Sequence, residues 1–329
     1  MSSVKKIAAF GLTLTMVAGV LPATAFAYSD KSGWVQNTET GKWSYYEDGR
    51  KVKSAVRYDS DSGNYYLLDT SGNRVTKKGW TTLKYYYSEY GDKISQSRKY
   101  YLGEGGVATA NGWKKIKGKY YYFERGLAYT DTVIPKNNTE DYNTIDYVYA
   151  VDKKGARITK KGWYHFKGTS YSSYDGSKST FDEWVYVKSG GKLAQGVKKI
   201  GGKKYVFTKY GVMARNSYGS SKDGKTYYLA DKNGVQVTKK GWHKVKYSYK
   251  YSHYGYTSSY KGTEYYYVKK DGTLQTGLKK IKGTYYCFDP DMMRNTNYYK
   301  DSKDKTYYTK YYFGRDGKCK KTEKIYYAT

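Results

Sequence analysis

Short runs of alternating apolar and polar residues, separated by glycine-containing turns, cover most of the chain. In KKIKGKYYYF at 114–123, two strand-like runs flank a Lys-Gly turn, which is the short-range pattern of a β-hairpin. In YYLLDTSGNRV at 65–75, the residues DTSGN are typical of a turn, because Asp, Ser and Asn supply local hydrogen bonds and Gly tolerates a positive φ angle. The pattern therefore predicts successive hairpins whose alternate side chains face opposite ways.

The hairpin motifs recur with a period of about 80 residues. A hexamer, VTKKGW or ITKKGW, stands at 75–80, 158–163 and 237–242. A second motif stands at 112–123, 196–207 and 277–288, and a third at 65–75, 147–158 and 227–237. Such a period is typical of repeat architectures, in which an isolated hairpin is marginal and stacking buries the face that it cannot cover alone.

The repeat predicts an all-β fold of tandem β-hairpins stacked into an elongated β-solenoid, with no large globular core. We expect three hairpins in each full unit and two at the N-terminal end. Each hexamer is expected to join two units, with its Val or Ile and its Trp packed, its lysines in water and its Gly in a turn. The predicted divisions are a signal peptide at 1–27, a partial repeat at 28–74, and repeat units at 75–157, 158–236 and 237–329, the last with a degenerate end.

One hairpin in each unit is longer and more variable than the others. It follows the hexamer, is rich in Tyr and Ser, and covers 81–102, 164–187 and 243–268. Variable segments on a regular scaffold often carry a binding function. Tolerated length variation in a solvated hairpin is the alternative.

The N-terminal residues have the features of a secretory signal peptide. A basic start, MSSVKK, precedes an uncharged apolar run at 7–23, and Ala-Phe-Ala at 25–27 fits the pattern that signal peptidase recognises. We predict cleavage after Ala27 and secretion. An uncleaved membrane anchor is the alternative, but the apolar run is short for a bilayer span. No later stretch is apolar enough to cross a membrane, so attachment to the cell surface is expected to be non-covalent.

The composition favours a thin, ring-packed structure. Hydrophobic residues make up 38% of the chain, but aromatic residues alone make up 19%, and 47 residues are Tyr. A tyrosine ring can pack while its hydroxyl stays in water. The net charge of +31 favours attraction to polyanions, although a solvated basic surface would give the same count. Cys287 and Cys319 each replace an apolar residue of the repeat, and the sequence leaves open whether they are buried thiols or a disulfide.

The motifs resemble the cell-wall-binding repeats of secreted Gram-positive proteins. That group includes choline-binding modules, and the glucan-binding and clostridial-toxin C-terminal repeats are similar. The residues that carry the resemblance are Gly33-Trp34, GKWSYY at 41–46, Gly49, Gly112-Trp113, GKYYYF at 118–123, and the Gly-Trp pairs that end at Trp80, Trp163 and Trp242. It covers most of the chain beyond the leader.

The resemblance implies ligand sites in aromatic grooves between successive hairpins. In the choline-binding branch a quaternary ammonium is held by Trp and Tyr faces through cation–π attraction. The best match to that pattern is Trp34, Trp43 and Tyr46, and the implied groove residues are these three with Trp80, Trp113, Tyr121, Trp163 and Trp242. The aligned motifs place the second tryptophan of the pattern at Trp43 only, with Tyr120, Lys204 and Tyr285 elsewhere, and replace the leading tryptophan by Val197 and Leu278.

No cofactor, metal site or catalytic motif is indicated. The three histidines, His165, His243 and His253, lie in the variable hairpins without a Cys or carboxylate cluster at metal-ligand spacing. Most Asp residues, such as Asp48, Asp69 and Asp231, occupy turn positions. There is no nucleophile elbow and no phosphate-binding glycine loop.

These features favour a non-catalytic, secreted protein that binds a bacterial cell-wall polymer: a teichoic acid, with or without choline, or a wall or glucan polysaccharide. An adhesin or toxin-like binder of host glycans is the first alternative. An electrostatic binder of extracellular nucleic acid is the second, because Lys interleaved with stacking aromatics suits single strands. An uncharacterised enzyme is the remaining hypothesis.

Overall fold

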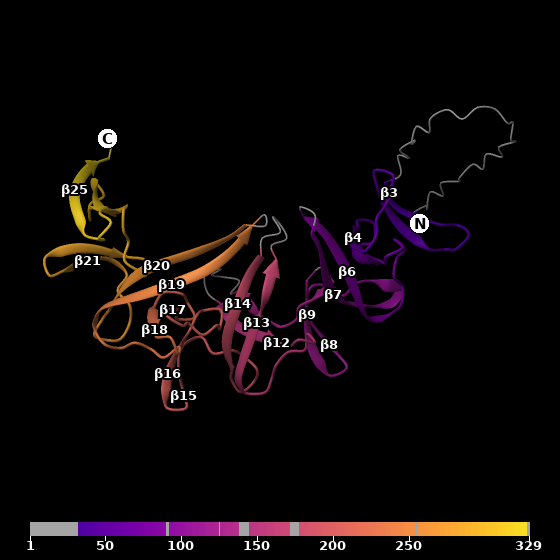
Figure 1. Ribbon diagram of the computed structural model, residues 1–329, viewed down its shortest axis with the longest axis horizontal. Helices are drawn as coiled ribbons and strands as arrows, with labels where there is room; N and C mark the ends of the chain where they lie inside the picture. The colour runs from indigo at the N-terminus through magenta and orange to yellow at the C-terminus, as the bar shows by residue number, and fades with distance from the viewer. Residues whose placement is uncertain are drawn as a thin grey trace.

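Antiparallel hairpins, arranged one after another along the long axis, make up the described part of the chain (Figure 1). The computed structural model describes residues 32–89, 92–124, 126–137, 145–171, 178–253 and 256–327, and the predicted leader lies outside them. The short hairpins are β1 (Gly33–Gln36) with β2 (Trp43–Glu47), β4 (Ala55–Asp59) with β5 (Asn64–Leu68), β8 (Gly112–Ile116) with β9 (Lys119–Glu124), β11 (Thr132–Asn137) with β12 (Ile145–Val151), β15 (Gly196–Ile200) with β16 (Lys203–Phe207), β17 (Ser217–Ser220) with β18 (Tyr227–Ala230), and β21 (Gly277–Ile281) with β22 (Thr284–Phe288).

Three long hairpins follow the three hexamers. They are β6 (Gly79–Glu89) with β7 (Asp92–Leu102), β13 (Gly162–Tyr171) with β14 (Lys178–Val187), and β19 (Gly241–His253) with β20 (Tyr256–Val268). Their far ends point to the same side of the molecule (Figure 1). The β14 and β19 strands are also bridged through Lys178 and Ser252, which links the long hairpins of two successive repeats.

The remaining elements are short strands and a C-terminal meander. The meander consists of β23 (Thr296–Asp301), β24 (Tyr307–Phe313) and β25 (Cys319–Tyr326), while β3 (Arg50–Lys51) and β10 (Leu127–Ala128) are two-residue strands and Glu104–Gly106 forms one 3-10 turn. The described segments hold no α-helix. The all-β class and the tandem hairpins predicted from the sequence are confirmed.

The tight turns of the short hairpins have the chemistry that the sequence predicted. In three of these hairpins, and in the turn between β2 and β3, two successive residues have positive φ angles, as a two-residue type I′ turn requires. These pairs are Asp48 and Gly49, Lys117 and Gly118, Gly201 and Gly202, and Lys282 and Gly283. Because the backbone twist of such a turn matches that of the flanking strands, the turn fixes the register of each hairpin.

The aspartates of the third motif are used in turns. Asp69 Oδ1 accepts hydrogen bonds from the backbone N–H groups of Ser71 and Asn73, both at 2.8 Å. The same arrangement is repeated at Asp152 and Asp231. These carboxylates satisfy backbone donors after the strand ends, which is a local structural role.

The hexamers join hairpins as the sequence predicted. Val75 packs on the buried cluster of Leu67, Leu83 and Leu102, and the equivalent Ile158 and Val237 pack on two further clusters. The glycine before each tryptophan has a positive φ angle of 120°, 151° or 123°. The lysines of all three hexamers are exposed. Each hexamer therefore carries the chain from one buried cluster into the next hairpin.

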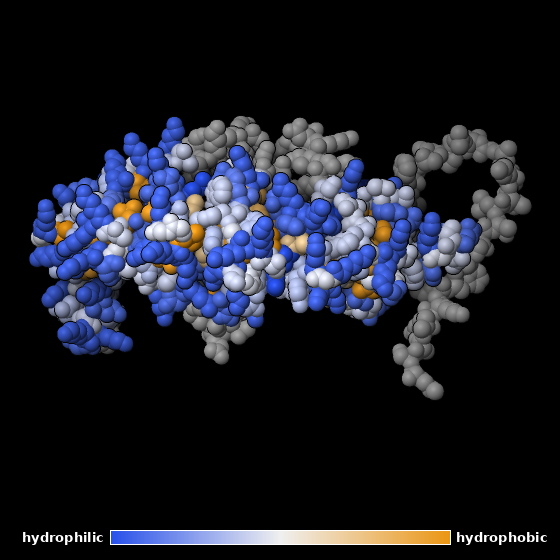
Figure 2. Space-filling view, turned by 90° about the horizontal axis from the view of Figure 1, so that it is seen from below, coloured by the Kyte–Doolittle hydropathy of each residue, from blue (hydrophilic) through white to orange (hydrophobic). Residues whose placement is uncertain are grey.

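The apolar residues are divided among small clusters, each between neighbouring hairpins. One cluster joins Val148 of β12 to Val185 of β14, and another joins Leu229 of β18 to Tyr266 of β20. On the face seen in Figure 2, hydrophobic residues form small separate patches along the length of the molecule among hydrophilic ones. The chain is therefore stabilised junction by junction, and the predicted absence of a large globular core is confirmed.

Both cysteines are free thiols, which answers the question that the sequence left open. Cys287 on β22 is 1% exposed, and this burial raises the pKa of its thiol to about 11. Cys319, at the start of β25, is partly exposed. The two thiols therefore differ in access.

We expect a thiol reagent at about pH 8 to modify Cys319 rapidly and Cys287 only after unfolding, because the thiolate is the reactive form. The measurement is the time course of thiol modification by mass spectrometry, with Cys319→Ser as the control. In that variant the fast phase should disappear. Rapid modification of Cys287 in the folded protein would contradict its burial.

Candidate functional site

Each hexamer tryptophan lies at a junction between two hairpins and contacts rings of both. Trp163 of β13 faces its cross-strand partner Tyr186 with ring centroids 5.1 Å apart and planes at 68°. The next hairpin contributes Tyr205, at 5.0 Å and 71°, and Phe207, at 5.9 Å and 25°. These are favourable edge-to-face and offset geometries for aromatic pairs. Trp163 therefore joins β13–β14 to β15–β16.

The same group of four rings recurs at the other two hexamers. The contacts are those of Trp80 with Tyr101 (5.1 Å), Tyr121 (4.8 Å) and Phe123 (6.0 Å), and of Trp242 with Tyr267 (5.5 Å), Tyr286 (4.9 Å) and Phe288 (5.6 Å). We call these three groups the hexamer clusters. Trp80 is 37% exposed and Trp242 41% exposed, although both pack on rings from two hairpins. Each cluster therefore keeps part of its tryptophan surface open to solvent.

Two further tryptophans occupy equivalent junctions outside the hexamers. Trp34 of β1 contacts Tyr45 across the strand at 5.1 Å and Tyr66 of the next hairpin at 5.6 Å. The corresponding contacts of Trp113 on β8 are with Tyr122 at 5.3 Å and Tyr149 at 5.4 Å. The tryptophans are thus distributed over several junctions along the chain.

A second aromatic position lies two residues before the cross-strand ring, on the same face of the hairpin. Trp43 has this relation to Tyr45, and Trp184 has it to Tyr186. The expectation that a second tryptophan occurs only at Trp43 was therefore wrong. Trp184 lies inside a variable hairpin, where the motif alignment stops. Its spacing before Tyr186 was the signal that could have revealed it.

The structure separates one of the three residues in the best sequence match from the other two. Trp34 pairs with Tyr45, and Trp43 lies on the same face two residues earlier, opposite Gln36. Tyr46 is opposite Gly33, and strand alternation directs its side chain to the other face. Trp34 and Trp43 therefore share the face of the hairpin on which Tyr66 contacts Trp34, while Tyr46 lies on the other face.

Cationic side chains lie against several of these rings. Lys99 occupies the second position beside Trp80, with its Nζ 4.1 Å from the ring centroid and donating to the Lys154 carbonyl at 2.8 Å. Partial burial lowers the pKa of Lys99. Arg74 and Arg157 lie over rings of the Trp34 and Trp113 groups. In the described segments, no Lys or Arg lies over the indoles of Trp163 or Trp242.

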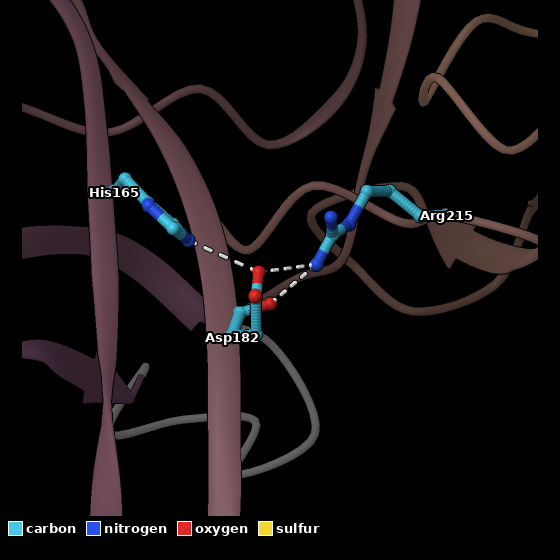
Figure 3. Close-up of polar contacts among 3 residues, drawn as sticks. All are labelled: His165, Asp182 and Arg215. Carbon is cyan, nitrogen blue, oxygen red and sulfur yellow. Dashed lines mark hydrogen bonds and ion pairs between the residues drawn. The ribbon is translucent and has the colours of Figure 1, made fainter. Parts of the chain in front are cut away.

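A charged group flanks the Trp163 cluster (Figure 3). His165 stacks on Trp184 with centroids 4.5 Å apart and planes at 10°. Its Nε2 lies 3.0 Å from Asp182 Oδ1, which also accepts a 2.6 Å hydrogen bond from Arg215. Hydrogen bonds from His165 and Arg215 hold the pKa of the Asp182 carboxyl below its ordinary value. Since Arg215 follows β16, this contact orients Trp184 across the same junction as Trp163.

The described residues contain no group of three or more His, Cys, Asp or Glu residues placed to hold a metal ion. Nor does this part of the chain include a helix that could span a membrane. A hollow of about 450 Å³ on β19–β20 is lined by Lys246, Tyr247, Lys261 and Gly262 among others. None of the hexamer tryptophans lines this hollow.

Comparison with known proteins gives one relative by sequence. Glucosyltransferase-I of Streptococcus downei is 26% identical over 219 residues, which are 64% of this chain and 11% of that protein. The chain thus spans about a tenth of the relative that it matches. No protein-family model matches.

Solved structures with similar folds include choline-binding proteins. Choline binding protein F from Streptococcus pneumoniae is 17% identical with a TM-score of 0.31, over 88% of this chain and 93% of that one. The choline-binding domain of CbpL from the same species is 18% identical with a TM-score of 0.23, over 89% and 99%. The matched proteins include choline-binding proteins, the kind of protein that the repeat motifs resemble.

Proposed function

We propose that this chain is a non-catalytic, secreted repeat protein that attaches to a cell-wall polymer through the hexamer clusters. The observation that carries the proposal is the recurrence of one four-ring arrangement, with a partly exposed tryptophan, at three junctions about 80 residues apart. A repeated site suits a repeated ligand, because several weak contacts to one polymer add up to strong attachment.

The chemistry of the clusters suits two parts of such a polymer. An open indole face attracts an organic cation such as choline by about 0.5–2 kcal/mol, depending on desolvation. Flat Tyr and Trp faces also stack on the apolar faces of sugar rings. The net charge of +31 favours a polymer that carries phosphates, and the exposed hexamer lysines beside each cluster place part of that charge at the site. A teichoic acid combines these features.

The same geometry suggests which part of the chain acts as one binding module. Each predicted unit, 75–157, 158–236 and 237–329, contains one long hairpin and one hexamer cluster. The unit is therefore proposed as the binding module, with the partial repeat at 28–74 as an N-terminal extension. The Trp163 cluster offers the fullest set of rings for an organic cation, because Trp184 occupies its second position. Met213 donates its backbone N–H to the Trp184 carbonyl at 2.7 Å and so ties this ring position to the following segment.

The test is a pull-down on purified bacterial wall with and without its teichoic acid, in the presence and absence of choline and of salt. We expect binding to fall when teichoic acid is removed and to weaken as salt is added, because surface charges are screened. Equal binding to both wall preparations, unaffected by choline or salt, would refute the proposal. Preferential binding to host glycans on an array, or to single-stranded DNA with a steep salt dependence, would favour the alternatives named above.

A further inference from the structure

Arg157 lies inside a group of three aromatic rings at the junction of β8–β9 and β11–β12. Its Cζ is 4.6 Å from the Tyr149 ring centroid, 4.8 Å from that of Tyr120 and 5.9 Å from that of Trp113. Trp113 and Tyr120 belong to one hairpin and Tyr149 to the next. A guanidinium within about 6 Å of several ring faces is in cation–π geometry with each of them.

The backbone fixes Arg157 at this place. Its N–H donates to the carbonyl of Tyr120 at 2.8 Å, so the arginine is tied to one of the rings that surround it. Its Nε is buried and has no hydrogen-bond partner among the described residues. Since a buried cationic nitrogen without a partner is unfavourable, the electron-rich faces of the three rings supply the compensating attraction.

A related arrangement occurs at the junction of β1–β2 and β4–β5, where Arg74 lies over one ring. Arg74 Cζ is 3.5 Å from the Tyr66 ring centroid, and the Arg74 backbone N–H donates to the Trp43 carbonyl at 2.7 Å. Its Nε is also buried without a partner, while one terminal nitrogen donates to the Gly105 carbonyl at 2.7 Å. Trp34, Trp43 and Tyr66 correspond in position to Trp113, Tyr120 and Tyr149. We call the two ring groups the arginine boxes.

The equivalent junction between β15–β16 and β17–β18 keeps one ring, Tyr228, but lacks the other two and the arginine. Val197 stands in place of the leading tryptophan, and Lys204 in place of the second ring. Gln236 stands in place of the arginine, and its backbone N–H still donates to the Lys204 carbonyl at 2.8 Å. The backbone is therefore the same in all three junctions. At this junction the arginine is therefore replaced together with two of the three rings.

We propose that Arg74 and Arg157 are built-in ligands of two aromatic cation sites. Each guanidinium occupies the position that an organic cation would take, so the arginine boxes are closed to quaternary ammonium ligands and serve instead to hold adjoining hairpins together. Removing the guanidinium opens a site for a small organic cation. The arginines thereby restrict cationic ligands to junctions whose indoles carry no internal Lys or Arg. This assignment goes beyond the proposed attachment to a polymer.

The test uses the Arg157→Gln variant, because glutamine already occupies the equivalent position at residue 236. Choline chloride is titrated into wild type and variant, and the indole N–H signal of Trp113 is followed by nuclear magnetic resonance. In wild type we expect no saturable shift of this signal. In the variant we expect saturation with a Kd on the order of 1–10 mM, the weak affinity of a single aromatic site. In the Arg157→Gln variant, N-ethylguanidinium should also shift the indole N–H signal of Trp113.

Two controls make the result specific. Arg215→Gln removes an exposed arginine that pairs with Asp182 and lies over no ring of the boxes, and should leave the Trp113 signal insensitive to choline. Arg157→Lys keeps a cation in the box and should also remain insensitive. A choline response at Trp113 in wild type, or no response in a folded Arg157→Gln variant, would overturn the proposal. Since no polymer is used, the result is independent of whether the chain binds cell wall.

Discussion

The Phe207→Ala substitution is expected to lower the free energy of unfolding of its junction by about 3–5 kcal/mol, the usual cost of truncating a buried phenylalanine. Phe207 has no exposed surface. It stacks on Trp163 of the preceding hairpin. A Cβ added at Gly219 of the following hairpin would lie only 2.4 Å from the Phe207 carbonyl oxygen. Phe207 thus contacts the preceding hairpin through its ring and the following hairpin through its backbone.

The measurement is urea denaturation followed by tryptophan fluorescence. Tyr210→Ala is the matched control, because this aromatic residue follows the same hairpin but is 45% exposed. Substitutions at such surface positions usually change stability by less than about 0.5 kcal/mol. If the two variants lost the same stability, packing at the junction would not be the source of the stability of the array.

The second large effect concerns attachment. Replacing both Trp163 and Trp242 with alanine should weaken binding to teichoic-acid-bearing wall by at least about tenfold, because two of three repeated contacts to the same polymer are removed and their avidity is lost. The measurement is a binding isotherm on purified wall. Circular dichroism and the corresponding double substitution to phenylalanine, which keeps a ring in each cluster, separate loss of ligand contact from loss of fold.

The control for the tryptophan variant is the Tyr58→Ala, Tyr299→Ala double variant. Both tyrosines are exposed, at 51% and 54%, and their ring contacts are with Tyr65 and Tyr308 of their own hairpins. We expect this variant to bind wall as wild type does. A loss as large as that of the tryptophan variant would mean that attachment depends on aromatic surface in general, not on the junctions.

Local sequence was sufficient to predict the hairpins and their joints. Turn pairs such as Lys117-Gly118 and turn carboxylates such as Asp69 act through bonds to residues a few positions away, so their pattern is visible in the sequence. The role of the hexamer could be predicted because its residues recur at three places with one spacing. Both are local properties of a repeated motif.

The composition of each groove was harder to predict, since it depends on alternation and on the next hairpin. A shift of one residue along a strand moves a side chain to the other face, which is why Tyr45 and not Tyr46 meets Trp34. Trp184 was missed because the variable length of this hairpin hides which residues of β13 and β14 are paired. Arg157 gave no sign of its role, because the rings around it lie up to 44 positions earlier in the chain.

The central claim is that rings shared by adjoining hairpins stabilise each junction separately. Hydrogen exchange with mass spectrometry, applied to Phe207→Ala and wild type, tests it most directly, because a repeat array couples only nearest neighbours. We predict that the variant loses amide protection in β13–β14, β15–β16 and β17–β18 and keeps wild-type protection in β1–β2, β4–β5 and β21–β22. A uniform loss of protection along the whole chain would show one cooperative core and contradict the account.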